Sequence, residues 1–336
     1  MAGFENNSLN DTGAASSNGT DGATSGMDSP TPIITAAAFV LLISILGMIG
    51  NSLVFWYLGF RIKRTKYTIY IINLAVADLI YLTFISIVMC ITFVLYLKAN
   101  SIENAFNIVY GLEIILDFGK YADMFFLTAI SVERCMSVYC PIWYRNNRPK
   151  NQSVFVCVII WGLSVLVTLV NNVGCPSEIF HEISGRCTSV LVFIAVLVFL
   201  VVIPLMIISS LILLITIRRT SRQVQPSKII IVIVASVVVF LISVAPVTLL
   251  WLLLYLDAYP SSFSIEGFFF AVYLCISINS SVNPFIYFLV GRHNMKGVCA
   301  YLERALKKVF REDDDEEESG PAKVQMDQET RDSNIS

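Results

Sequence analysis

Seven long apolar stretches restrict the fold of this chain more than any other feature. They occupy residues 32–59, 68–97, 103–138, 152–173, 188–217, 228–256 and 264–290. A helix of roughly 20 apolar residues is long enough to cross the hydrocarbon core of a bilayer. Only 14% of the residues are charged, against about a quarter in soluble domains. The sequence therefore predicts an all-α membrane protein, a seven-transmembrane helix bundle over residues 32–290.

Basic residues gather in alternate connections between these stretches. Residues 60–67, 133–152 and 218–228 each hold four Lys or Arg, and residues 291–311 hold six, together 18 of the 23 in the chain. Cytoplasmic segments next to transmembrane helices carry such an excess. We therefore expect a multi-pass plasma membrane protein with an extracellular N-terminus and a cytoplasmic C-terminus.

The N-terminal residues 1–31 differ sharply from the apolar stretches. They are rich in Ser, Asn, Gly and Thr, a composition typical of disorder. They contain three N-glycosylation sequons, at Asn6, Asn10 and Asn18. Because this segment is expected outside the cell, we predict a glycosylated extracellular tail.

The chain after the last apolar stretch divides into two parts. Residues 291–311 place apolar side chains at helical spacing, with Lys and Arg on the other faces. This pattern predicts an amphipathic eighth helix that lies on the inner leaflet and contacts membrane lipid. Cys299 is a candidate for palmitoylation there, and an unmodified thiol is the alternative. Residues 312–336 read as a disordered acidic cytoplasmic tail with few phosphate acceptors, so we expect only modest arrestin recruitment.

The third apolar stretch is unusual because it contains four charged side chains: Glu113, Asp117, Lys120 and Asp123. On an α-helix all four fall within an arc of about 120°. An unpaired ion in hydrocarbon costs several kcal/mol, so this arc must face the bundle interior or a cavity. Lys120 is three residues from both Asp117 and Asp123 and can pair with either. The arc is therefore either a network that satisfies itself or a binding site.

Short landmark motifs follow one another along the stretches: Gly50-Asn51, Leu74-Ala75-Val76-Ala77-Asp78, Glu133-Arg134-Cys135, Trp161, Pro204, Pro246 and Asn283-Pro284-Phe285-Ile286-Tyr287. This set resembles the class A (rhodopsin-like) G protein-coupled receptors. The segments "GNSLVFWYLGFRIKR", "INLAVADL" and "SVERCMSVYCPIWYRNNRPK" are similar to the Mas-related receptor subfamily. The resemblance implies a receptor that binds an extracellular ligand and activates heterotrimeric G proteins of the Gq and/or Gi class.

The cysteines agree with this narrower resemblance. Most class A receptors tie the second extracellular loop to the third helix, but Val109 stands at the matching position here. A disulfide between Cys175 and Cys187, within that loop, is similar to the Mas-related arrangement. Two free thiols are the alternative. A locally closed loop leaves the bundle mouth open, which favours a peptide or another exposed ligand.

The resemblance also implies where a ligand binds. Class A receptors hold ligands near the outer mouth, which gives a predicted ligand-binding set of Glu113, Asp117, Lys120 and Tyr121. We expect the two acids to receive a cationic group. In the cationic Mas-related site the acids correspond to Asn171 and Leu191 of this chain, so that specificity does not carry over.

Asp78 and Asp123 are expected at similar depth, facing each other where many class A receptors hold sodium. Two close carboxylates resist simultaneous ionisation, so a sodium ion, a proton or Lys120 must compensate one of them. We slightly favour Lys120. The implied sodium and activation network is Asn51, Asp78, Asp123, Asn279, Asn283, Pro284 and Tyr287.

Glu133 and Arg134 resemble the family's Asp/Glu-Arg-Tyr motif, which couples to the G protein. In that family the acid holds the arginine at rest, and Tyr287 would stabilise the open state. The simpler alternative is that Arg134 only anchors the helix at the lipid surface. The short connection near 218–228 has no acid that could hold Arg134, so constitutive activity is expected.

The sixth stretch departs from the family pattern. Most class A receptors carry a Trp two residues before the proline of this helix, whereas this chain has Val244 before Pro246. Mas-related receptors also lack that Trp. Activation must then use other packing changes around Pro246, which weakens the helix by removing a backbone hydrogen bond.

Other functions are less consistent with the sequence. His181 and His293 lie on opposite sides of the predicted membrane, and neither a catalytic constellation nor metal-ligand spacing is present, so we expect no enzyme. No nucleic-acid partner and no cofactor beyond the candidate sodium ion are expected. The alternatives are a decoy receptor without coupling, and an ion channel or proton-linked transporter that uses Asp78, Lys120 and Asp123 as a relay.

Overall fold

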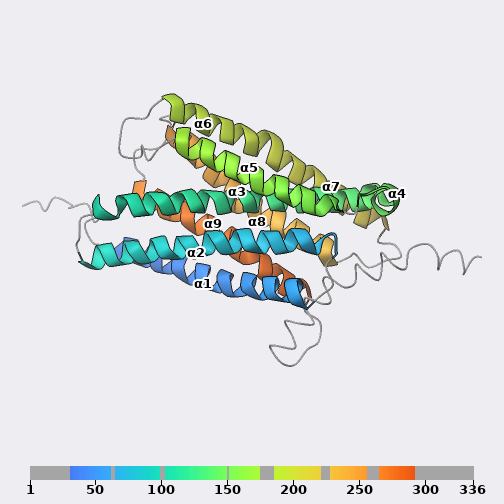
Figure 1. The fold of residues 1–336 in the computed structure, drawn as a ribbon, viewed down its shortest axis with the longest axis horizontal. Helices are drawn as coiled ribbons and strands as arrows, with labels where there is room; N and C mark the ends of the chain where they lie inside the picture. The colour runs from blue at the N-terminus through green and yellow to red at the C-terminus, as the bar shows by residue number, and fades with distance from the viewer. Residues whose placement is uncertain are drawn as a thin grey trace, which may run out of the picture.

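A computed structural model of the protein describes residues 31–61, 65–98, 103–149, 151–174, 185–220, 228–255 and 265–291. The long helices run side by side along one axis of the molecule (Figure 1). Those formed from one unbroken α-helix are α1 (Thr31–Phe60), α2 (Thr68–Lys98), α3 (Glu103–Tyr139), α5 (Gln152–Gly174), α8 (Lys228–Tyr255) and α9 (Ile265–Gly291). Each agrees with a predicted stretch to within a few residues. The helix-bundle prediction is therefore confirmed.

The fifth predicted span is divided into three parts. It begins with α6 (Gly185–Val196), continues through a π-helical turn (Leu197–Val202) and ends with α7 (Ile203–Thr220). Pro204 follows the wide turn directly and has no backbone N–H to donate to the preceding turn. A π turn is a common way for a helix to accommodate such a defect. The sequence marked Pro204 as a landmark but did not predict the change in helix type.

The bundle is apolar on the outside and polar within. Within the described residues, six spans are long and apolar enough to cross a membrane, and α3 is the exception because of its charges. Large apolar side chains such as Phe155, Leu200 and Ile242 are more than 60% exposed. Asp78 and Asp123 are buried instead. A lipid surrounding explains both observations, since it accepts apolar side chains and excludes charges.

Close helix packing brings α3 into the centre of the bundle. α3 contacts α2, α5 and α7, and α1 packs on α2 and α9. At Gly119 a Cβ atom would lie 3.0 Å from the backbone nitrogen of Tyr81 on α2. At Gly50 a Cβ would lie 2.9 Å from Cβ of Pro284 on α9. Small residues at such crossings allow transmembrane backbones to approach closely.

One end of the bundle is marked by the short helix α4 (Pro141–Asn146), which we call the α4 end (Figure 1). The N-terminus of α3 lies at the opposite end. Several predictions fall outside the described residues and stay predictions: the glycosylation sites Asn6, Asn10 and Asn18, the loop cysteine Cys175, the eighth helix over 291–311 with Cys299, and the acidic tail.

Candidate functional site

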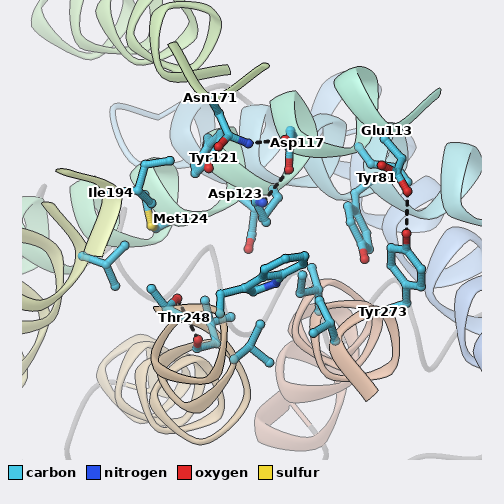
Figure 2. Close-up of a pocket in the computed structure, with 18 of the residues that line it drawn as sticks. Tyr81, Glu113, Asp117, Tyr121, Asp123, Met124, Asn171, Ile194, Thr248 and Tyr273 are labelled. Carbon is cyan, nitrogen blue, oxygen red and sulfur yellow. Dashed lines mark hydrogen bonds and ion pairs between the residues drawn. The ribbon is translucent and has the colours of Figure 1, made fainter. Parts of the chain in front are cut away.

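A cavity of about 190 Å³ lies within the bundle on the side away from α4. Helices α2, α3, α5, α6, α8 and α9 all contribute to its wall. The structure brings the predicted ligand-binding residues together here, because Glu113, Asp117, Lys120 and Tyr121 all line this cavity. Asp123 lines it as well, as Figure 2 shows. The charged arc of α3 therefore faces a cavity, as predicted from its helical spacing.

Asp117 is the most fully compensated acid of the cavity. Its Oδ1 accepts a hydrogen bond from Nζ of Lys120 at 2.5 Å. Its Oδ2 accepts from Nδ2 of Asn171 at 2.7 Å and from Nδ2 of Asn172 at 3.3 Å. The Lys120 ammonium also lies over the ring of Tyr121, 4.5 Å from its centroid. Asp117 therefore has both a counter-ion and two amide donors.

Glu113 lies one turn further from the α4 end and has a different environment. Its Oε1 accepts a hydrogen bond from the hydroxyl of Tyr273 at 2.7 Å (Figure 2). Within the described part of the chain, no Lys or Arg forms an ion pair with Glu113. It is thus the acid near the cavity mouth that still lacks a cation.

Sequence reasoning missed the residues that distinguish these two acids. Asn171 was considered only as a position lacking an acid, and Asn172 and Tyr273 were not considered. They are polar residues inside apolar helices, which is the one signal that could have identified them. Which acid each would contact depends on how α5 and α9 are placed against α3.

The lower part of the cavity reaches a buried pair of acids. Oδ2 of Asp123 accepts a hydrogen bond from Asn279 at 2.6 Å, and Oδ2 of Asp78 accepts from Asn283 at 3.2 Å. Oδ1 of each acid is buried and has no hydrogen-bond partner. The two carboxyl groups also interact electrostatically with each other. A proton or a small cation is therefore needed between them.

The structure does not give that role to Lys120, the cationic side chain among the described residues that line the cavity. Lys120, which we slightly favoured as the counter-charge of the pair, forms its ion pair with Asp117 instead. Among the described residues no group of three or more His, Cys, Asp or Glu gathers into a metal site. The two free carboxyl oxygens nevertheless fit a single small cation such as sodium, or a shared proton.

The rest of the predicted activation network lies around the same acids. Nδ2 of Asn51 donates to the backbone oxygens of Ser280 at 3.0 Å and Gly47 at 3.1 Å. This joins α1 to α9 just beside Asn279. Pro284 packs against Gly50, and Tyr287 is buried one turn further toward the α4 end. The structure thus brings these residues close to one another between α1, α2, α3 and α9.

A second polar cluster lies at the α4 end. Glu133 forms an ion pair with Arg148 and accepts a hydrogen bond from Tyr144 at 3.0 Å. Arg148 also donates to Ser153 at 2.7 Å. Burial raises the pKa of the Tyr144 hydroxyl well above its usual value, and the charge of Glu133 raises it further, so this group remains a donor.

Arg134 contacts an aromatic ring near the α4 end. Its guanidinium lies over the ring of Tyr67, 3.5 Å from the centroid, a cation–π contact. Glu133 meanwhile faces Arg148. Sequence reasoning singled out Glu133 and Arg134 but missed Arg148, Tyr144 and Tyr67.

Cys187 is disulfide-bonded. The other described cysteines are free: Cys90, Cys135, Cys140, Cys157 and Cys275. The predicted partner, Cys175, lies outside the described residues, so the Cys175–Cys187 pairing stays a prediction.

Comparison with known proteins agrees with this architecture. Residues 50–287 match the model of the 7 transmembrane receptor (rhodopsin family). The chain is 39% identical to the proto-oncogene Mas of Rattus norvegicus over 287 residues, which cover 84% of this chain and 85% of that protein. It is 34% identical to Mas-related G-protein coupled receptor member D of Macaca fascicularis, over 83% of this chain and 86% of that protein. It is 34% identical to member F of Rattus norvegicus, over 84% and 80%.

Proposed function

Because this chain belongs to the rhodopsin family of seven-transmembrane receptors, and within it to the Mas and Mas-related G protein-coupled receptors, we propose that it binds a basic extracellular ligand in the α3 cavity. Binding would activate a heterotrimeric G protein of the Gq and/or Gi class at the α4 end. The distribution of Lys and Arg supports this orientation, with the α4 end inside the cell. We therefore propose the plasma membrane as its location.

The observation that carries the ligand class is the difference between Glu113 and Asp117. Asp117 is already compensated by Lys120 and two amides. Among the described residues, Glu113 accepts a hydrogen bond from the neutral hydroxyl of Tyr273 and forms no ion pair. A carboxylate in a cavity with apolar walls gains most from a cation that arrives with the ligand. We therefore assign the cationic group of the ligand, such as an amino terminus or a basic side chain of a peptide, to Glu113.

A screen of basic peptides with calcium and cyclic-nucleotide readouts tests this function. In cells with normal surface expression, we expect Glu113→Gln to lower agonist potency by about tenfold or more, since a charge-assisted hydrogen bond is lost. Tyr273→Phe is the matched control, because it removes the hydroxyl that donates to Glu113 and keeps the negative charge of Glu113. Unchanged potency in Glu113→Gln would contradict the assignment, and silence in every G protein assay would favour a decoy receptor.

The rival proposal, a channel or proton-linked transporter, has less support. Its relay needs Lys120 beside Asp123, but the ion pair of Lys120 is with Asp117. The Asp78 and Asp123 pair remains our proposed site for a sodium ion or a shared proton, through the free oxygen on each acid. Arrestin and membrane lipid remain proposed partners of the C-terminal segment.

A further inference from the structure

The cavity is deeper than a site at Glu113 alone requires. Glu113 and Asp123 both line it, although ten residues of α3 separate them. Ten residues correspond to about 15 Å along a helix axis. Figure 2 shows both acids in the same cavity, Glu113 beside Tyr273 and Asp123 nearer to Met124. The cavity is thus long enough to hold two separate ionic contacts.

Val244 on α8 lines the same cavity as Asp123, as do its neighbours Val247 and Phe240. Val244 stands where most class A receptors carry a Trp, two residues before Pro246. A valine side chain is far smaller than an indole ring, so it leaves space between α8 and α3.

Asp123 has an unused acceptor at this end of the cavity. Only 2% of the residue is exposed. Oδ2 is occupied by Asn279 at 2.6 Å, while Oδ1 is buried and accepts no hydrogen bond. A buried carboxyl oxygen without a donor is costly, and the neighbouring carboxyl of Asp78 adds repulsion. A ligand cation that enters from the cavity would relieve both costs by replacing the sodium ion or shared proton proposed for this pair of acids.

The described side chains of the cavity wall include more acids than bases. Three carboxylates and one ammonium line it, contributed by Glu113, Asp117, Asp123 and Lys120. Because Lys120 pairs with Asp117, Glu113 and Asp123 are the acids of the described cavity wall that have no side-chain cation as an ion-pair partner. Between them the wall includes apolar side chains, among them Leu116, Met124 and Val247. Such a wall suits a flexible hydrocarbon chain with a charge at each end.

We propose that Asp123 is a second cationic subsite and that the ligand of this receptor is an elongated dication. One ammonium or guanidinium group binds Glu113, and the other reaches Oδ1 of Asp123 at a spacing of about 15 Å. A linear polyamine or a peptide with two separated basic side chains has this chemistry. The inference rests on the proposed function, because it extends the cationic site at Glu113.

The probe for this subsite is a linear diamine whose nitrogens are about 15 Å apart. Its matched control is the amino alcohol of the same length, which replaces one ammonium by a hydroxyl. Binding to the purified full chain is measured in detergent micelles by the ligand-dependent shift in thermal unfolding. We expect the diamine to bind about tenfold or more tightly than the amino alcohol, the effect of one charged hydrogen bond.

Two variants test whether the tighter binding of the diamine depends on Asp123. Asp123→Asn should reduce diamine binding to the level of the amino alcohol and leave amino alcohol binding nearly unchanged. Val244→Trp should do the same by closing the space above Asp123, whereas Val244→Ile should keep the extra affinity. If Val244→Trp does not fold, a diamine of half the length replaces it as the test, and it should bind no more tightly than the amino alcohol.

The failures of the two proposals can be told apart. Equal binding of the diamine and the amino alcohol to the wild-type chain, with both weakened by Glu113→Gln, would overturn the second subsite and leave the first. Absence of binding by both would overturn the cationic site at Glu113 and the second subsite with it. Extra affinity that persists in Asp123→Asn would also overturn the second subsite.

Discussion

Lys120→Met is expected to lower the free energy of unfolding by up to about 3 kcal/mol, the lower end of the range for breaking a buried ion pair. Within the described ranges, Lys120 is the cation that contacts Asp117, so in the variant Asp117 would retain the amides of Asn171 and Asn172. The side chains of Lys120 and Asp117 are 28% and 20% exposed to the cavity, which places the cost below that of a fully enclosed pair. Thermal unfolding of the purified protein measures the change.

The double variant Lys120→Met with Asp117→Asn is the control for this prediction. It removes both charges and keeps similar side-chain volumes, so most of the lost stability should return. A double-mutant cycle over the four proteins gives the coupling energy between Lys120 and Asp117. If the double variant were no more stable than Lys120→Met, the pair would not explain why both charges are kept in this helix.

Gly119→Ala is expected to destabilise the protein by about 2 kcal/mol, within the range for overpacking a well-packed contact. A Cβ at this position would lie 3.0 Å from the backbone nitrogen and 3.2 Å from the Cα of Tyr81. Backbone atoms cannot rotate away as a side chain can, so α2 and α3 would have to move apart. The melting temperature of the variant, compared with that of the wild type, reports the effect.

Gly111→Ala provides a matched control on the same helix. A Cβ at Gly111 would have nothing within 4 Å. There the substitution changes only helix propensity, which favours Ala by up to about 1 kcal/mol. Gly111→Ala should therefore be neutral or stabilising, while Gly119→Ala should not. Equal melting temperatures for the two variants would show that α2 and α3 are not packed as closely as the structure indicates.

Much of the fold follows from the sequence because lipid imposes simple rules. Each apolar stretch had to become a helix, since a helix satisfies its own backbone hydrogen bonds in hydrocarbon. The charged arc of α3 had to face inward for a similar reason, and its members do line the cavity. The fifth span was less predictable, because Pro204 can be accommodated by a kink or by a π turn.

The individual contacts of the site could not be predicted in the same way. Helical spacing left Lys120 equidistant from Asp117 and Asp123, and the choice between them depends on the other helices. Asn171 and Asn172 of α5 approach Asp117, while Asn279 of α9 approaches Asp123. The motif Glu133-Arg134 likewise did not indicate that Arg148, fifteen residues after Glu133, would form an ion pair with Glu133.

The sequence by itself determined the number of membrane helices, the side of α3 that turns inward and the polar residues that must lie inside the bundle, because lipid cannot solvate charges or backbone groups. The tertiary structure alone decided which acids are compensated and which are not. Among the described residues, Asp117 has Lys120 as an ion-pair partner, while Glu113 and Asp123 accept hydrogen bonds from neutral groups of α9, because ion pairs and hydrogen bonds act over a few ångströms and depend on how the helices pack.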